Sequence, residues 1–133
     1  LNKDRVYFSN SIGDVTAVDI QSGKIIWQTP TQSNITFAST YFLKLSDIVS
    51  DGKSIFVSDN NNQFFSIDLL SGTINWKQDL SSELRSALIG DYLVAISDDG
   101  LLIVMNKETG QIIRINDLLK NIKEKKKSFY KNS

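Results

Sequence analysis

The sequence of 133 residues contains no cysteine and no histidine. The absence of cysteine excludes disulfide bonds, thiol catalysis and thiolate metal sites. The absence of histidine removes the commonest general base and metal ligand. One proline and seven glycines are too few for a fibrous or low-complexity chain. No hydrophobic run reaches the length of a membrane-spanning helix. The composition therefore indicates one globular unit that lacks the Cys and His side chains on which many enzymes rely.

Charge is balanced overall, with 15 basic and 15 acidic side chains, but it is unevenly distributed. Residues 120–133 hold six lysines and one glutamate, a net charge of +5, so residues 1–119 carry −5. An acidic body gives no electrostatic basis for binding nucleic acid. We expect residues 120–133 to form a lysine-rich linker or tail, solvated or disordered, because blocks of like charge repel. The alternative is a basic peptide that binds an acidic surface or lipid.

A short frame recurs along the chain: a small or apolar residue, then Asp, then Gly, then Trp. The second copy has Ser in place of Ala, and the third keeps only the Gly. The glycines are 49 and 38 residues apart, which brackets the period of propeller blades. The copies are Ala17-Asp19-Gly23-Trp27, Ser66-Asp68-Gly72-Trp76 and Val104-Asn106-Gly110-Arg114.

The choice of residue at each position of the frame has a physical explanation. The carboxylates of Asp19 and Asp68 can accept hydrogen bonds from N–H groups of the turn that follows each strand. A glycine at the chain reversal reaches a positive φ without a Cβ clash. An indole needs a large apolar contact and a partner for its N–H. Because one hairpin cannot bury such a ring, the neighbouring repeat must supply the other wall.

These motifs resemble the repeat of quinoprotein-type (PQQ-like) β-propellers, over about residues 5–115. The resemblance implies an all-β fold, a partial β-propeller of four-stranded antiparallel blades. Family members that bind the quinone use a stacking Trp, a calcium site with acidic ligands and often a vicinal disulfide. The disulfide is impossible here, and both tryptophans belong to the frame. We therefore predict no catalytic residues, no cofactor and no metal.

The alternation of apolar and polar residues predicts three blades over about residues 1–30, 45–80 and 84–116, within a propeller unit of residues 1–119. The first blade lacks one strand, which we expect before Leu1, and the residues Asn116–Leu119 are expected to form a helical turn. The long connection 31–45 is expected to add a strand or a loop over the propeller. Three blades cannot close a ring, so the open flanks favour self-association.

Two acidic-amide clusters, at residues 59–62 and 98–100, fall between strands of the second and third blades. A calcium loop of the EF-hand type that began at Asp59 would need a Glu at its twelfth position, where Leu70 stands. We therefore interpret both clusters as hairpin turns.

The non-enzymatic members of this fold, the BamB type, assist the insertion of β-barrels into the outer membrane and dock through loops on one propeller face. Their docking loop contains Leu and Arg, and the stretch with Leu80, Leu84 and Arg85 is similar in residue type. These three residues are our candidates for partner binding. The alternative is that Leu84 and Arg85 begin a core strand.

The resemblance implies a non-catalytic protein-binding scaffold in a Gram-negative periplasm, associated with the outer membrane. Its partners would be the periplasmic domains of a barrel-inserting outer-membrane protein. The rival interpretations are a segment of a PQQ-dependent dehydrogenase and a generic propeller adhesin or sensor.

Overall fold

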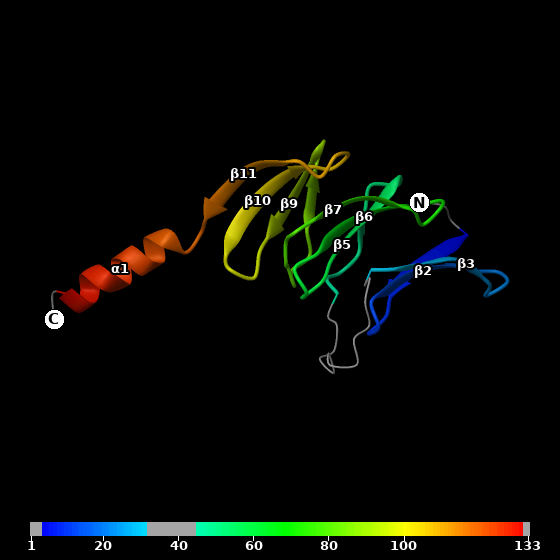
Figure 1. Ribbon diagram of the computed structural model, residues 1–133, viewed down its shortest axis with the longest axis horizontal. Helices are drawn as coiled ribbons and strands as arrows, with labels where there is room; N and C mark the ends of the chain where they lie inside the picture. The colour runs from blue at the N-terminus through cyan, green and yellow to red at the C-terminus, as the bar shows by residue number, and fades with distance from the viewer. Residues whose placement is uncertain (1–3, 32–44, 132–133) are drawn as a thin grey trace.

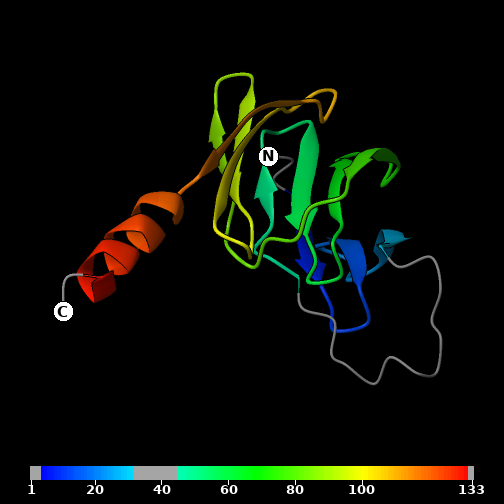
Figure 2. The same ribbon diagram turned by 60° about the vertical axis from the view of Figure 1, so that its left-hand side comes forward.

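The computed structural model describes residues 4–31 and 45–131. These residues form eleven β-strands in three antiparallel sheets, followed by one α-helix (Figures 1 and 2). The three sheets follow one another along the chain, and each is a meander of sequential strands. The expectation of an all-β fold built from antiparallel propeller blades is confirmed.

Blade 1 has three strands within the described residues, as expected, and blades 2 and 3 have four each. Blade 1 consists of β1 (Arg5–Ser9), β2 (Asp14–Asp19) and β3 (Ile25–Pro30). Blade 2 consists of β4 (Val49–Ser50), β5 (Ser54–Ser58), β6 (Phe64–Asp68) and β7 (Ile74–Gln78). Blade 3 consists of β8 (Ala87–Ile89), β9 (Tyr92–Ile96), β10 (Leu101–Asn106) and β11 (Ile112–Asp117).

The end of the chain differs from the sequence expectation. The helical turn expected at Asn116–Leu119 is absent, because β11 continues to Asp117. The tail, expected to be disordered or a linker, forms helix α1 (Lys120–Lys131). The Asp117 carboxylate accepts N–H bonds from Leu119 and Lys120, at 2.9 and 3.1 Å, and caps the helix. Lysine and glutamate have good helix propensity, and this propensity outweighs the repulsion between the lysine charges. The expectation for the connection 31–45 falls almost wholly outside the described residues.

The core lies between the blades in two clusters. The first joins blades 1 and 2 and contains Val15, Trp27, Val57 and Phe65, among others. The second joins blades 2 and 3 through residues on the opposite face of blade 2, and Phe64 belongs to it. Blade 2 is therefore covered on both faces, and its strand β6 has four fully buried positions in succession.

The tryptophan of one blade lies on the frame glycine of the next. The Trp27 indole of blade 1 covers Gly72 of blade 2, and a Cβ added to Gly72 would lie 2.5 Å from the ring. The Trp76 indole covers Gly110 of blade 3 in the same way, with a corresponding distance of 2.6 Å. The indole N–H groups donate to the backbone carbonyls of Leu69 and Lys107, at 3.2 and 2.9 Å. The neighbouring repeat thus supplies the second wall, as the sequence predicted.

Every blade has a β-bulge between its last two strands. The bulge lies next to the residue that is paired with the fourth residue of the frame, which is Trp27, Trp76 or Arg114. Ala17 lies directly opposite Trp27, and the register shifts at the next residue, Val18. The corresponding shifts in the other blades follow Ser66 and Val104. A bulge bends the strand and increases its twist. The small residue opposite each tryptophan leaves room for the ring, which explains the first position of the frame.

Candidate protein-binding surface

The blades have two distinct ends, which we call the linker end and the hairpin end. At the linker end, the connection between β7 and β8 (residues 79–86) meets the turns that follow β5 and β9. The Ser81 hydroxyl donates to the Asp59 carbonyl at 3.1 Å, and the Asp98 N–H donates to the Ser81 carbonyl at 3.0 Å. At the hairpin end, the β4–β5 hairpin meets the β6–β7 turn, where the Leu69 N–H donates to the Lys53 carbonyl at 2.8 Å.

Buried serines fasten the 79–86 connection to the blades on both sides. The Ser82 N–H donates to the Ser58 hydroxyl oxygen of blade 2 at 2.9 Å. The Ser82 hydroxyl, in turn, lies 2.7 Å from the Ile96 carbonyl of blade 3 and donates to it. The Glu83 N–H donates to the Asp98 carboxylate at 3.0 Å. The connection is therefore held in one shape, although its composition is that of a solvated loop.

The candidate binding residues divide into a buried one and two exposed ones. Leu80 is only 4% exposed and packs in the cluster between blades 2 and 3, so its side chain cannot reach a partner at the surface. Leu84 is 57% exposed and Arg85 is exposed. Strand β8 begins at Ala87, so Leu84 and Arg85 precede the strand rather than start it. The three exposed residues 83–85, which we call the linker tip, form the candidate surface.

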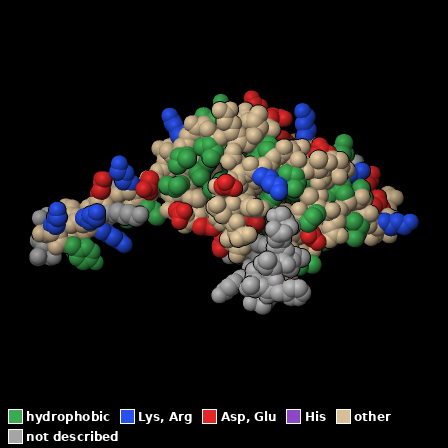
Figure 3. Space-filling model, in the orientation of Figure 1, with side chains coloured by type: hydrophobic (Ala, Val, Ile, Leu, Met, Phe, Trp, Pro, Cys, Tyr) green, Lys and Arg blue, Asp and Glu red, His purple; other side chains and the backbone are tan. Residues whose placement is uncertain are grey.

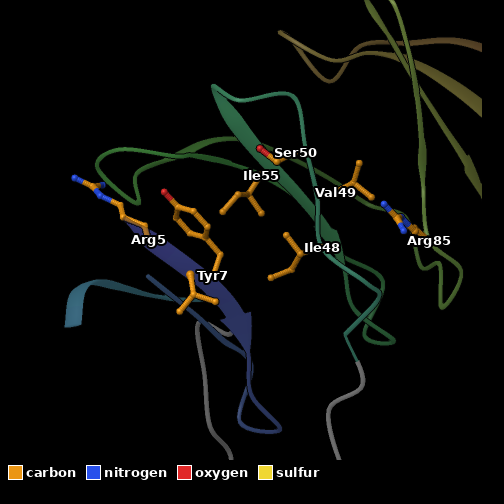
Figure 4. A pocket seen from close by; sticks show the side chains of 8 residues that line it. Arg5, Tyr7, Ile48, Val49, Ser50, Ile55 and Arg85 are labelled. Atoms are coloured by element: carbon orange, nitrogen blue, oxygen red, sulfur yellow. The ribbon is translucent and has the colours of Figure 1, made fainter. Parts of the chain in front are cut away.

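A groove of about 430 Å³ lies beside the linker tip, with Arg85 at one end and Arg5 at the other (Figure 4). Its wall between the two cations is mainly apolar, with Ile48, Val49 and Ile55, and also includes Ser50. The groove follows β1, which pairs only with β2 among the described residues. The groove therefore lies along a strand edge that is open among the described residues, whereas residues 83–85 are exposed at the surface. We keep the linker tip as the candidate binding surface.

The acidic residues of the frame have structural roles. The Asp19 carboxylate accepts the N–H and the O–H of Ser22, both at 2.7 Å, and these hydrogen bonds lower the pKa of Asp19. Hydrogen bonds from the N–H and O–H of Ser71 lower the pKa of Asp68 in the same way. The Asn106 side-chain oxygen accepts the equivalent bonds in blade 3, from the N–H and O–H of Thr109. Each turn is therefore closed by its own side chain, as the sequence predicted.

Asp59 is a buried carboxyl that sequence reasoning treated only as a turn residue. Its Oδ1 accepts the N–H groups of Asn61 and Gln63, at 2.9 and 2.8 Å, so the prediction of a hairpin turn there is confirmed. Its Oδ2 is buried and has no hydrogen-bond partner among the residues that the structure describes. Burial raises the pKa of Asp59 against the opposing effect of the two N–H bonds. No group of three or more acidic side chains that could hold a metal ion occurs in the described part of the chain.

Neither tryptophan offers an open platform for a flat cofactor. One face of Trp27 rests on Gly72, and its ring lies 5.9 Å from the Tyr7 ring, between centroids. Trp76 lies between Gly110 and the stacked ring of Phe64, whose centroid is 6.0 Å away. Both indoles serve the contact between blades.

Comparison with known families shows to which family the repeats belong. Residues 1–116 match the family model described as outer membrane protein assembly factor BamB. The chain belongs to this family. The match ends within β11, so helix α1 lies beyond the matched region.

Two curated relatives show the extent of the similarity. An uncharacterized protein of Rickettsia prowazekii is 26% identical over 119 residues, which cover 86% of this chain and 29% of that protein. The outer membrane protein assembly factor BamB of Escherichia coli K12 is 28% identical over 104 residues, which cover 76% of this chain and 24% of that protein. The chain thus spans roughly a quarter of the length of these relatives.

Solved structures support the fold. The quinohemoprotein alcohol dehydrogenase of Comamonas testosteroni aligns with a TM-score of 0.68 at 15% identity, over 85% of this chain and 19% of that one. At this identity the likeness concerns the fold alone.

Proposed function

We propose that this chain contributes to a non-catalytic protein-binding scaffold for outer-membrane β-barrel assembly. The observation that carries the proposal is the family match over residues 1–116, because that family is described as an outer membrane protein assembly factor. The scaffold would work in a Gram-negative periplasm, in association with the outer membrane. Its partners would be the periplasmic domains of a barrel-inserting outer-membrane protein.

The linker tip is the part of the chain that we assign to the partner. Leu84 offers an exposed apolar side chain, and Arg85 beside it offers an exposed cation. Arginine is enriched at protein interfaces, and an exposed apolar side chain beside it adds surface that a partner can bury. The hydrogen bonds of Ser82 and Glu83 hold the backbone in place before binding, which reduces the ordering cost of association. A partner surface with a carboxylate opposite Arg85 fits this arrangement.

A segment of a PQQ-dependent dehydrogenase is the second candidate. Its support is the fold shared with the Comamonas testosteroni enzyme. The packing of Trp27 and Trp76 does not favour the dehydrogenase, since both rings already contact a glycine of the next blade. No feature of residues 4–31 and 45–131 favours the third candidate, an adhesin or sensor propeller.

The experiment is a binding titration of the chain with the purified periplasmic domains of the barrel-inserting protein from the same bacterium. We expect Arg85→Glu to weaken binding about tenfold or more, because it places a carboxylate against the partner's acidic surface. The matched control is Lys53→Glu, the same charge reversal at the hairpin end, which should bind like the unmodified chain. Thermal melts of both variants check that the fold is retained. Equal binding by Arg85→Glu and the unmodified chain would contradict the assignment.

A further inference from the structure

Helix α1 carries a basic amphipathic surface that the scaffold does not use. It projects from the end of blade 3 away from the sheets (Figures 1 and 2). Its N-terminus is fixed to the blade, because Leu119 packs on Gly100 and the Leu118 N–H donates to the Gly100 carbonyl at 3.1 Å. The rest of the helix lies beyond these anchors. It is therefore presented to the surroundings at a fixed point rather than packed on the core.

The helix has an apolar stripe. Ile122 and Phe129 are seven residues apart, so they lie on the same side of the helix, and Tyr130 borders them. The exposed fractions are 51% for Ile122 and 74% for each of the two aromatic residues. Phe129 and Tyr130 meet edge to face, with ring centroids 6.0 Å apart. A contiguous exposed apolar patch with polar residues around it is the kind of surface that marks an interaction site.

Lysines surround this stripe. The sequence of the helix contains six lysines, no arginine and one glutamate, Glu124. Lys126 lies within the stripe, between Ile122 and Tyr130 around the helix, and Lys125 borders the stripe. Lys127 and Lys131 lie nearer the opposite side. Figure 3 shows Lys side chains along the projecting helix and a hydrophobic group on one side of it. The remainder of the chain carries the opposite charge, −5.

We propose that α1 binds in the plane of an anionic lipid surface. Lysines attract anionic headgroups, and their flexible stems allow the ammonium groups to reach the headgroups while the apolar stripe enters the acyl boundary. Phe and Tyr are suited to this interface, since their rings are apolar and the tyrosine tip is polar. The helix lies on the surface rather than spanning it, because none of the helices among the described residues is long and apolar enough to cross a membrane. The site is thus a lipid contact, separate from the protein-binding surface proposed at the linker tip.

The test is a co-sedimentation assay of the full chain with vesicles. Vesicles of phosphatidylcholine that contain phosphatidylglycerol should retain the chain, and vesicles of phosphatidylcholine alone should not. The double variant Lys125→Gln/Lys126→Gln should lower the partition coefficient by at least tenfold, since each lysine near an anionic surface is worth about fivefold. The matched control Lys24→Gln/Lys53→Gln makes the same charge change on the blades and should leave the partition coefficient unchanged.

A second variant separates lipid insertion from simple charge attraction. Phe129→Ser/Tyr130→Ser keeps all six lysines, and we expect it also to reduce vesicle binding by at least tenfold. Helical circular dichroism of each variant checks that α1 still forms. Vesicle binding that is unaffected by Phe129→Ser/Tyr130→Ser would overturn the proposal, as would tighter binding of the full chain to polyglutamate or duplex DNA than to the anionic vesicles.

Discussion

The indole of Trp27 lies on Gly72 of the next blade, and its N–H donates to the Leu69 carbonyl of the same turn at 3.2 Å. This contact joins residues that are 45 positions apart through one apolar and one polar interaction. Trp76 repeats it on Gly110, with its N–H on the Lys107 carbonyl at 2.9 Å. The two contacts fix how blade 2 sits on blade 1 and how blade 3 sits on blade 2. They therefore set the position of the linker tip.

Replacement of Trp27 by Ala should lower the free energy of unfolding by about 3–5 kcal/mol, the usual range for a buried large aromatic residue. Trp27→Phe keeps part of the apolar contact and loses the hydrogen bond to Leu69, so it should cost less. Urea denaturation of the two variants measures the difference. A Trp27→Ala variant as stable as the unmodified chain would show that the ring is not part of the core.

Replacement of Gly72 by Ala tests the other half of the contact. Gly72 has a φ of 75°, and an added Cβ would lie 2.5 Å from the Trp27 ring. Gly52 is the matched control, because its φ is 89° and no atom lies within 4 Å of an added Cβ. Both substitutions carry the backbone cost of the left-handed region, about 1–2 kcal/mol. Gly72→Ala should cost about 1–3 kcal/mol more, from steric overlap. Equal melting temperatures for the two variants would contradict the docking geometry.

Asp59→Asn should stabilise the chain at neutral pH. Burial raises the pKa of Asp59, so the folded state holds its proton more tightly than the unfolded state. The neutral form stabilises the fold, and this stabilisation is complete below the ordinary aspartate pKa. It is lost as pH rises through the raised pKa of Asp59. Asparagine keeps the group neutral at all pH values. Asn10 makes the same pair of bonds in blade 1, to the N–H groups of Ile12 and Asp14, so the turn accepts asparagine.

The measurement for Asp59→Asn is the free energy of unfolding as a function of pH. The gain of the variant over the unmodified chain should be largest at neutral pH and should shrink as pH falls through the raised pKa of Asp59 to the ordinary aspartate value. A variant that is less stable than the unmodified chain at neutral pH would show that the charged carboxylate is favourable in the fold.

Ser82→Ala should loosen the linker tip. The Ser82 hydroxyl donates to the Ile96 carbonyl at 2.7 Å, and alanine leaves that half-buried acceptor with one bond fewer. We expect a loss of about 1 kcal/mol in stability, as for a typical intramolecular hydrogen bond. Amide hydrogen exchange at Leu84 and Arg85 should become faster. Unchanged exchange there would indicate that the other hydrogen bonds of the connection suffice to hold the tip.

The local structure of the blades follows from short sequence signals. Apolar and alternating runs of the sequence coincide with strands, as at β5 (Ser54–Ser58) and β10 (Leu101–Asn106). The Asp and Gly of the frame predicted the turns, because both residues act on the backbone only a few positions away in the sequence. The need of each indole for a second wall and an N–H partner was also visible in the sequence.

Features that depend on contacts between distant residues were not predicted. The bulge after Ala17 arises from how two strands pair, and the pattern of single strands does not contain it. Ser82 looks like a loop residue, although it is fully buried between Ser58 and Ile96. Leu80 has the residue type of a docking residue, but packing between blades buries it. Helix α1 was missed because the repulsion of its lysines received more weight than its Asp117 cap.

Hydrogen exchange of the chain with and without its proposed partner tests the central claim most directly. We expect the periplasmic domains of the barrel-inserting protein to protect the peptide that contains Leu84 and Arg85, and to leave the Asp51–Lys53 hairpin at the opposite end unchanged. Protection at the hairpin end instead, or no protection at the linker tip when the partner is bound, would contradict the account.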